Sequence, residues 1–229
     1  MVVRKIFKNL NKIYMKSYLK KILRKLPILF FFVKYITIRY QIFLSKPKWN
    51  ALKNQSEIKL DLGSGSKKGA NGWTTIDIGD ADIKWDLKLG IPLKDESVNR
   101  IYSSHLLEHI SYNNLIPFLK ECKRVLLWGG EFSVCVPNSR LFIEAYKEDK
   151  LFQNRTEWWQ PGMIDTGSNI DQINYIAYMR NEHKYMFDEQ NLINTLKKAG
   201  FLNVSLREFD DSLDLIERDR ESIYAKAIK

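Results

Sequence analysis

The chain of 229 residues has few cysteines and no long uncharged apolar stretch at its N-terminal end. Its two cysteines, Cys122 and Cys135, are too few for a disulfide framework and fall in segments with helix and strand patterns, which predicts reduced thiols in a cytoplasmic protein. The apolar run at residues 28–33 is far shorter than the roughly 18 uncharged residues of a spanning helix, and no small-residue cleavage site follows it. These absences argue against a disulfide-rich secreted protein and against a spanning helix or signal peptide in this region.

Acidic residues are missing from the first quarter of the chain. Residues 1–55 contain 14 Lys or Arg and no Asp or Glu, whereas the remaining 174 residues contain 23 basic and 27 acidic residues. The net charge of +10 therefore belongs entirely to an N-terminal extension, and the rest of the chain carries −4. We predict an extension over residues 1–55 and a single domain over residues 56–229, which is long enough to bury a core.

The extension has the pattern of a basic amphipathic helix that ends near Pro27. Apolar residues keep helical spacing between basic residues that recur every four positions. We predict that residues 1–44 bind an anionic membrane surface, where each basic residue contributes about 1 kcal/mol and the three phenylalanines insert. The alternatives are a helix that caps the domain, and RNA binding. The residues concerned are Arg4, Lys8, Lys12, Lys16, Lys20 and Arg24, followed by Phe30, Phe31 and Phe32.

A glycine-rich loop between two apolar runs opens the domain. Residues 58–62 predict a buried strand, Gly63 and Gly65 allow a sharp turn and close approach to a ligand, and Asp77 ends the next strand. The third glycine of a dinucleotide fingerprint is absent, because that position is Lys68. Asp77 also follows Gly65 by 12 residues instead of roughly 20. The pattern predicts a nucleotide cradle and disfavours a nicotinamide cofactor.

Strand and helix patterns alternate through the rest of the domain, which predicts a doubly wound, mostly parallel α/β sheet. Gly129-Gly130 is expected to end a helix over residues 112–127, and Asp188 to cap the last helix, which ends at Gly200. The expected strands after the cradle are residues 98–104, 132–136, 201–209 and 222–228.

Five motifs in order give the domain a family resemblance. The chain resembles the class I S-adenosylmethionine-dependent methyltransferases of the methyltransferase type 11 kind, from about Ile58 to Arg140 and again at the C-terminal strands. Trp73, directly before the second strand, is similar to a short-looped subgroup associated with polysaccharide biosynthesis. The motifs are Leu-Asp-Leu-Gly-Ser-Gly (60–65), Thr-Ile-Asp (75–77), Trp-Asp-Leu (85–87), the segment 91–110, and Arg-Val-Leu-Leu-Trp-Gly-Gly (124–130).

The resemblance implies a Rossmann-like fold that binds S-adenosylmethionine. Asp77 is expected to accept hydrogen bonds from the ribose hydroxyls, since a carboxylate at a strand end only accepts and can bind a vicinal diol. Asp86 is expected to approach the adenine amine, and Asp61 and the two glycines to hold the methionine portion. The full set of expected cofactor-binding residues is Asp61, Gly63, Gly65, Asp77, Asp86 and Ser104.

The sequence His105-Leu-Leu-Glu-His109 supplies the candidate catalytic residues. His105 is the better candidate for a general base, because it lies nearest the carboxyl end of its strand, and His109 is the second candidate. His109 as a structural histidine beneath the cofactor is an alternative. The pattern also fits an inverted zincin motif, in which residues 105, 108 and 109 would share a helix face, but its place after a strand argues against a peptidase. We predict no metal, and a divalent ion held by this segment is the least favoured alternative.

Residues 139–187 form a long insertion before the last helix. Its aromatic residues, among them Trp158, Trp159, Tyr175 and Tyr178, predict a substrate lid, with a satellite hydrophobic core as the alternative. His183 follows them and is expected to lie toward the substrate.

The predicted function is O-methylation of a small-molecule or glycan- or lipid-linked acceptor at the cytoplasmic face of a membrane. The alternatives are a non-catalytic cofactor-binding scaffold and an RNA methyltransferase. The −4 charge of the domain disfavours nucleic acid. Ser-Ser-His-Leu-Leu-Glu also stands where base-amino methyltransferases carry an Asn/Asp-Pro-Pro-aromatic motif.

Overall fold

The computed structural model describes residues 27–65, 69–70, 72–153 and 165–229. Contacts divide the chain into two compact units, Met1–Lys46 and Pro47–Lys229. The basic helix expected before Pro27 lies outside the described residues. The predicted boundary between residues 55 and 56 stays a prediction.

The described part of the first unit is helical. Helix α2 runs from Pro27 to Leu52 and crosses the division between the units. Within the first unit, large apolar side chains of α2 are exposed to solvent, among them Phe31, Phe32 and Phe43. Among the described helices, none combines the length and the apolar character that crossing a membrane requires.

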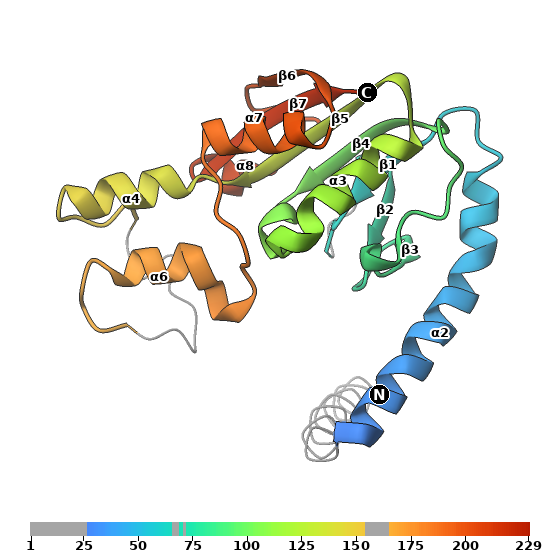
Figure 1. The fold of residues 1–229 in the computed structure, drawn as a ribbon, viewed down its shortest axis with the longest axis horizontal. Helices are drawn as coiled ribbons and strands as arrows, with labels where there is room; N and C mark the ends of the chain where they lie inside the picture. The colour runs from blue at the N-terminus through green and yellow to red at the C-terminus, as the bar shows by residue number, and fades with distance from the viewer. Residues whose placement is uncertain (1–26, 66–68, 71, 154–164) are drawn as a thin grey trace, which may run out of the picture. The chain divides into compact units, whose positions relative to one another are not determined.

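The second unit is built on a seven-stranded sheet with the order β3-β2-β1-β4-β5-β7-β6 (Figure 1). Strands β3, β2, β1, β4 and β5 are parallel, and β7 runs antiparallel between β5 and β6. The predicted doubly wound, mostly parallel α/β fold is confirmed. The strands are β1 (Lys59–Leu62), β2 (Thr74–Asp77), β3 (Ile83–Lys84), β4 (Val98–Ser104), β5 (Leu126–Pro137), β6 (Leu202–Leu206) and β7 (Ser222–Ile228).

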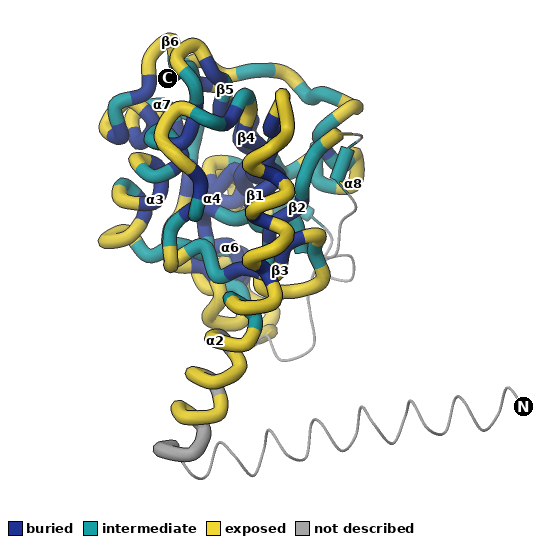
Figure 2. Tube along the Cα trace, turned by 90° about the vertical axis from the view of Figure 1, so that its right-hand side faces the viewer, coloured by how far each residue is buried: buried dark blue, intermediate teal, exposed yellow. Residues whose placement is uncertain are grey.

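The centre of the sheet forms the hydrophobic core. Leu60 and Leu62 in β1, Ile76 in β2 and Ile101 in β4 are fully buried. Figure 2 shows the buried trace running through these central strands. The apolar residues of these strands lie in the core although polar residues stand between them in the sequence.

Helices α3 (Tyr112–Val125) and α7 (Glu189–Lys198) lie side by side over one face of the sheet (Figure 1). The apolar positions of α3 recur at helical spacing, and its Leu115, Leu119 and Cys122 are buried against the core. Asp188 caps α7 as predicted, because its Oδ1 accepts a hydrogen bond of 2.7 Å from the Asn191 N–H.

The predicted helix end at Gly129-Gly130 is wrong. Helix α3 ends at Val125, and the glycine pair lies inside β5. Leu126 pairs with Val98 before the register shifts, so that Glu131 pairs with Arg100. A glycine pair accommodates such a bulge in a strand as readily as it ends a helix, and the sequence alone did not distinguish the two.

The insertion forms a hydrophobic core of its own in its described part. Phe142 of α4 (Ser139–Lys147) packs with Tyr175 and Ile176 of α6 (Asp171–Tyr178). This arrangement matches the alternative of a satellite core for these residues. Trp158 and Trp159 lie outside the described residues, and the lid stays a prediction.

Candidate active site

The carboxyl ends of the central strands meet at one edge of the sheet. β1 pairs with β2 and with β4, and Leu62 lies opposite both Ile76 and Ser103. Gly63, Asp77 and His105 stand at or directly after the ends of these three strands. Ligands of open parallel sheets bind outside this edge, so the structure brings the predicted cofactor loop and the predicted catalytic segment together.

Gly63 places the glycine-rich loop against the segment after β4. Its backbone is left-handed at φ +73°, and its N–H donates a 2.8 Å hydrogen bond to the Ile76 carbonyl. A Cβ at this position would lie 2.8 Å from the Leu106 side chain, which is closer than real contacts allow. Only glycine therefore fits, and the loop directly touches the residue that follows His105.

Asp77 organises the loop from the end of β2. Its Oδ2 accepts a 3.0 Å hydrogen bond from Gly65 N–H, and its Oδ1 accepts one of 2.6 Å from Gly79 N–H. Each carboxylate oxygen keeps acceptor capacity for a further donor, as a ribose diol requires. A Cβ on Gly65 would meet none of the described residues within 4 Å, so the described part of the chain leaves open space beside the loop. These residues fit the nucleoside end of S-adenosylmethionine.

The other expected cofactor residues are buried or already hydrogen-bonded to neighbouring residues. Asp61 is buried within β1. Asp86 caps the short 3-10 turn η1 (Leu87–Leu89), and its Oδ1 accepts a 3.0 Å hydrogen bond from Lys88 N–H. Ser104 is buried, and its hydroxyl lies 3.5 Å from a guanidinium nitrogen of Arg218. Their roles toward the cofactor stay predictions.

His105 is held in a fixed tautomer. Its Nε2 lies 2.9 Å from Ser222 Oγ, and that hydroxyl donates its own proton to the Arg218 carbonyl at 2.6 Å. Ser222 can then only accept from the imidazole, so Nε2 carries the proton and Nδ1 carries the lone pair. Burial, together with the nearby charge of Arg218, lowers the pKa of His105 to about 3. His105 is thus a weak base in this setting.

The segment from His105 to His109 does not form the continuous helix that the inverted zincin motif would require. His105 has a left-handed backbone at φ +52°, and only Leu107–His109 form a 3-10 turn, η2. Left-handed non-glycine residues are uncommon and concentrate at functional sites. The turn directs both His105 and His109 toward Glu108.

Glu108 lies at the centre of the site and is only 2% exposed. Its Oε1 is 3.5 Å from His105 Nδ1 and 3.8 Å from His109 Nε2. Neither carboxyl oxygen has a hydrogen-bond partner among the described residues. Burial raises the pKa of Glu108 to about 8, because the charged form loses its hydration.

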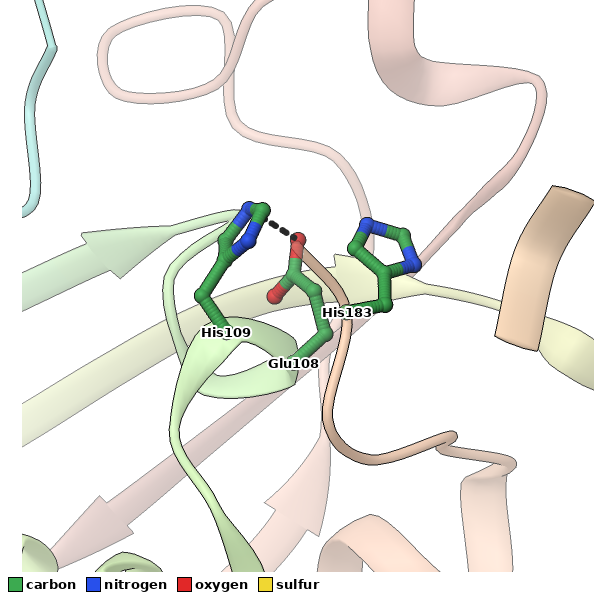
Figure 3. Close-up of side chains that lie close together, drawn as sticks. All are labelled: Glu108, His109 and His183. Carbon is green, nitrogen blue, oxygen red and sulfur yellow. Dashed lines mark ion pairs between the residues drawn. The ribbon is translucent and has the colours of Figure 1, made fainter. Parts of the chain in front are cut away.

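His183 completes the cluster from a distant part of the chain (Figure 3). Its ring packs edge-on against that of His109, with centroids 5.0 Å apart. The backbone fixes this approach, since Lys184 N–H and Tyr185 N–H donate to the Glu108 carbonyl at 2.7 and 3.2 Å. We call the four side chains of His105, Glu108, His109 and His183 the Glu108 cluster.

Glu108 was not among the catalytic residues predicted from the sequence. His183 was expected near the substrate, but no spacing rule links residues that are more than 70 positions apart. The one available signal was the acidic residue between two histidines in His105-Leu-Leu-Glu-His109.

Comparison with known proteins places this site in a family context. Residues 64–134, from the loop after β1 into β5, match the family described as Methyltransferase domain. The chain is an S-adenosylmethionine-dependent methyltransferase. Its sheet order, with β7 antiparallel between β5 and β6, is that of the Rossmann-like methyltransferase fold. S-adenosylmethionine is its cofactor, and the loop held by Asp77 fits the nucleoside end of that molecule.

Several solved methyltransferases are similar to this chain at low sequence identity. A SAM-dependent methyltransferase from Archaeoglobus fulgidus is 15% identical, with 87% of this chain and 99% of that chain covered and a TM-score of 0.46. One from Mesorhizobium loti is 18% identical, with 80% and 96% covered and a TM-score of 0.45. Phosphoethanolamine N-methyltransferase 2 of Haemonchus contortus is 10% identical, with 80% and 52% covered and a TM-score of 0.45. No match was found among curated proteins.

Proposed function

We propose that the methyltransferase acts on a hydroxyl oxygen of a small-molecule or glycan- or lipid-linked acceptor, which binds against the Glu108 cluster. The observation that carries this proposal is the contact between the cofactor loop and the catalytic segment. Gly63 lies so close to Leu106 that no Cβ fits between them. An acceptor beside the Glu108 cluster would therefore be within reach of the cofactor's methyl group.

A hydroxyl acceptor suits the chemistry of the cluster. S-adenosylmethionine supplies a methyl group on a positively charged sulfonium, which is already a good electrophile. A neutral hydroxyl must lose its proton as its oxygen is methylated, so the protein needs a proton acceptor beside the cofactor. The cluster offers imidazole nitrogens and a carboxyl group whose pKa of about 8 is close to neutral pH.

His109 is the catalytic candidate that the geometry favours. Its side chain is 34% exposed, whereas that of His105 is 13% exposed and bonded to Ser222. An acceptor that arrives from solvent meets His109 first. We keep His105 as a positioning residue, which holds the cluster through Ser222.

Turnover of paired variants tests this assignment. We expect His109→Ala to lower kcat by about 10²–10⁴ while the S-adenosylmethionine affinity stays within about twofold, because proton removal acts in the transition state. His105→Ala should lower the melting temperature more than it lowers kcat. The assay supplies hydroxyl-bearing acceptors, including glycan and lipid-linked ones, and measures release of S-adenosylhomocysteine. Normal turnover in His109→Ala, or transfer to amine acceptors alone, would contradict the proposal.

We further propose that the enzyme docks on an anionic membrane. Residues 1–55 hold 14 basic and no acidic residues, and the described part of α2 exposes Phe31, Phe32 and Phe43. Basic residues near acidic headgroups with apolar residues that insert are typical of peripheral binding. An acceptor linked to a membrane lipid would then be concentrated at the enzyme.

A further inference from the structure

We propose that Glu108, His109 and His183 bind one divalent transition-metal ion, contrary to the sequence-based expectation of no metal. Each of these residues offers one ligand atom, and the three atoms lie within 4.8 Å of one another. Figure 3 shows the carboxyl group between the two imidazole rings. Two imidazoles and one carboxylate are a ligand set that suits zinc and related ions.

The environment of Glu108 supports a cation at this place. The side chain is fully buried, and both carboxyl oxygens lack hydrogen bonds among the described residues. A buried carboxyl group is normally hydrogen-bonded or paired with a charge. A bound ion would supply the partner that the surrounding described residues do not.

The two imidazoles are oriented as metal ligands. Nδ1 of His183 lies 2.7 Å from the Ile176 carbonyl, and Nδ1 of His109 lies 3.3 Å from the Glu182 carbonyl. A carbonyl oxygen only accepts, so each Nδ1 carries the proton and each Nε2 keeps its lone pair. Metal-binding histidines commonly donate their second ring N–H to a backbone carbonyl in this way.

His105 adds a third lone pair that faces the same carboxyl group. Its Nε2 proton is committed to Ser222, and its Nδ1 lies 3.5 Å from Glu108 Oε1. The nitrogen that each of the three imidazoles turns toward Glu108 therefore carries a lone pair, and a carboxylate also only accepts hydrogen bonds. A single proton on Glu108 would satisfy one of these nitrogens, whereas a metal ion among them satisfies several at once.

The distances require only small movements. His109 Nε2 and Glu108 Oε1 are 3.8 Å apart, and ligand atoms bonded to a tetrahedral zinc ion are about 3.4 Å apart. The backbone that carries the ligands is already fixed, because Lys184 N–H and Tyr185 N–H hydrogen-bond to the Glu108 carbonyl. The three ligand atoms, which lie within 4.8 Å of one another, would move closer together by side-chain rotation to bind one ion.

The site would keep a coordination position for a ligand from outside. Three protein ligands around a tetrahedral ion leave a fourth position, which is the arrangement of catalytic rather than structural zinc. The exposed side of His109 gives solvent access to that position. On the proposed function, on which this step rests, the hydroxyl oxygen of the acceptor would bind the ion at this position. The ion would lower the pKa of that hydroxyl, so that its proton leaves to water. With the ion bound, His109 would act as a metal ligand instead of as the proton acceptor.

Metal titration of the full-length, untagged protein tests the site. The protein is stripped with a chelator and titrated with Zn²⁺ by calorimetry, and with Co²⁺ by visible absorption. We expect one ion per chain and the visible bands of tetrahedral Co²⁺. Glu108→Gln and His183→Ala should each weaken Zn²⁺ binding by about 100-fold or more, since each removes one of three ligands. Glu182→Gln is the matched control, because it removes a neighbouring charge outside the ligand set and should bind Zn²⁺ as the wild type does.

The outcomes separate this inference from the proposed function. Glu108→Gln preserves the side-chain shape, so circular dichroism can confirm its fold even if His183→Ala fails to fold. No stoichiometric Zn²⁺ binding by the wild type would overturn the metal site, and so would equal affinity in Glu108→Gln. If His109→Ala loses turnover but the wild type binds no Zn²⁺, the metal site is refuted and the proposed function is supported. Ligand-dependent Zn²⁺ binding without transfer to any hydroxyl would support the metal site and refute the O-methylation.

Discussion

The contact between Gly63 and Leu106 makes a quantitative prediction about the loop that binds the cofactor. Replacing Gly63 by Ala places a Cβ 2.8–2.9 Å from three side-chain atoms of Leu106. The backbone at this position is also left-handed. The backbone strain should cost about 1–2 kcal/mol, and the overpacking about 1–3 kcal/mol more. We therefore expect Gly63→Ala to lower the free energy of unfolding by about 2–5 kcal/mol.

Gly65 provides the matched control in the same loop. Its φ of +61° is similar, but a Cβ there would meet no described residue within 4 Å. Gly65→Ala should therefore cost only the strain of about 1–2 kcal/mol. Its added methyl group would project into the open space of the cofactor cradle, so we expect weaker S-adenosylmethionine binding by about tenfold or more, or about 1.4 kcal/mol.

Urea denaturation of a double-mutant cycle separates the contact from the strain. Leu106→Ala removes the atoms that the new Cβ would strike, so the double variant Gly63→Ala/Leu106→Ala should be more stable than the sum of the single effects predicts. The coupling should be about 1–3 kcal/mol. Effects that add to within about 0.5 kcal/mol, or equal losses in Gly63→Ala and Gly65→Ala, would refute the reasoning.

Three further predictions concern the cofactor, the extension and pH. Asp77→Ala should weaken S-adenosylmethionine binding by about 1.5–3 kcal/mol in calorimetry, because hydrogen bonds to a charged acceptor are lost; Asp80→Ala, whose side chain is 89% exposed, should have no effect, and equal losses would refute the assignment. Deleting residues 1–44 should abolish sedimentation with anionic vesicles while cofactor binding persists, and raised salt should mimic the deletion; continued sedimentation of the truncated protein would contradict membrane docking. The hydrogen bond from Arg124 lowers the pKa of Glu121, so this carboxylate stabilises the fold above its unfolded pKa and the stabilisation is lost as pH falls through the lowered folded value. Glu121→Gln should cost about 1 kcal/mol at pH 7, discounted for the partial exposure of the pair, and nothing well below pH 4, as urea denaturation at both pH values can check; an equal cost at both would show that the charge is irrelevant.

Local patterns predicted the strands of the sheet well. The expected ranges for β4 and β7 agree with the structure. Asp188 was recognisable as a cap from its place before a helical pattern. The cap is a local interaction, because Asp188 accepts its hydrogen bond from the N–H of Asn191, three residues further on.

Local sequence patterns could not predict the Glu108 cluster. It depends on how residues 105–109 turn after β4 and on where the insertion returns the chain. His105 has a left-handed backbone, and its Nδ1 lies 3.5 Å from Glu108 Oε1. Neither feature has a signature in the sequence pattern. The approach of His183 to Glu108 is set by tertiary hydrogen bonds, which have no signature in spacing.

The central claim is that this chain binds S-adenosylmethionine through the loop after β1. Calorimetric titration of the full-length protein with S-adenosylmethionine, followed by competition with S-adenosylhomocysteine and with NAD⁺, tests it most directly. We predict saturable binding of one S-adenosylmethionine per chain, displaced by S-adenosylhomocysteine and unaffected by NAD⁺. Absence of binding by either sulfur compound across pH and salt conditions, or displacement by NAD⁺, would contradict the account.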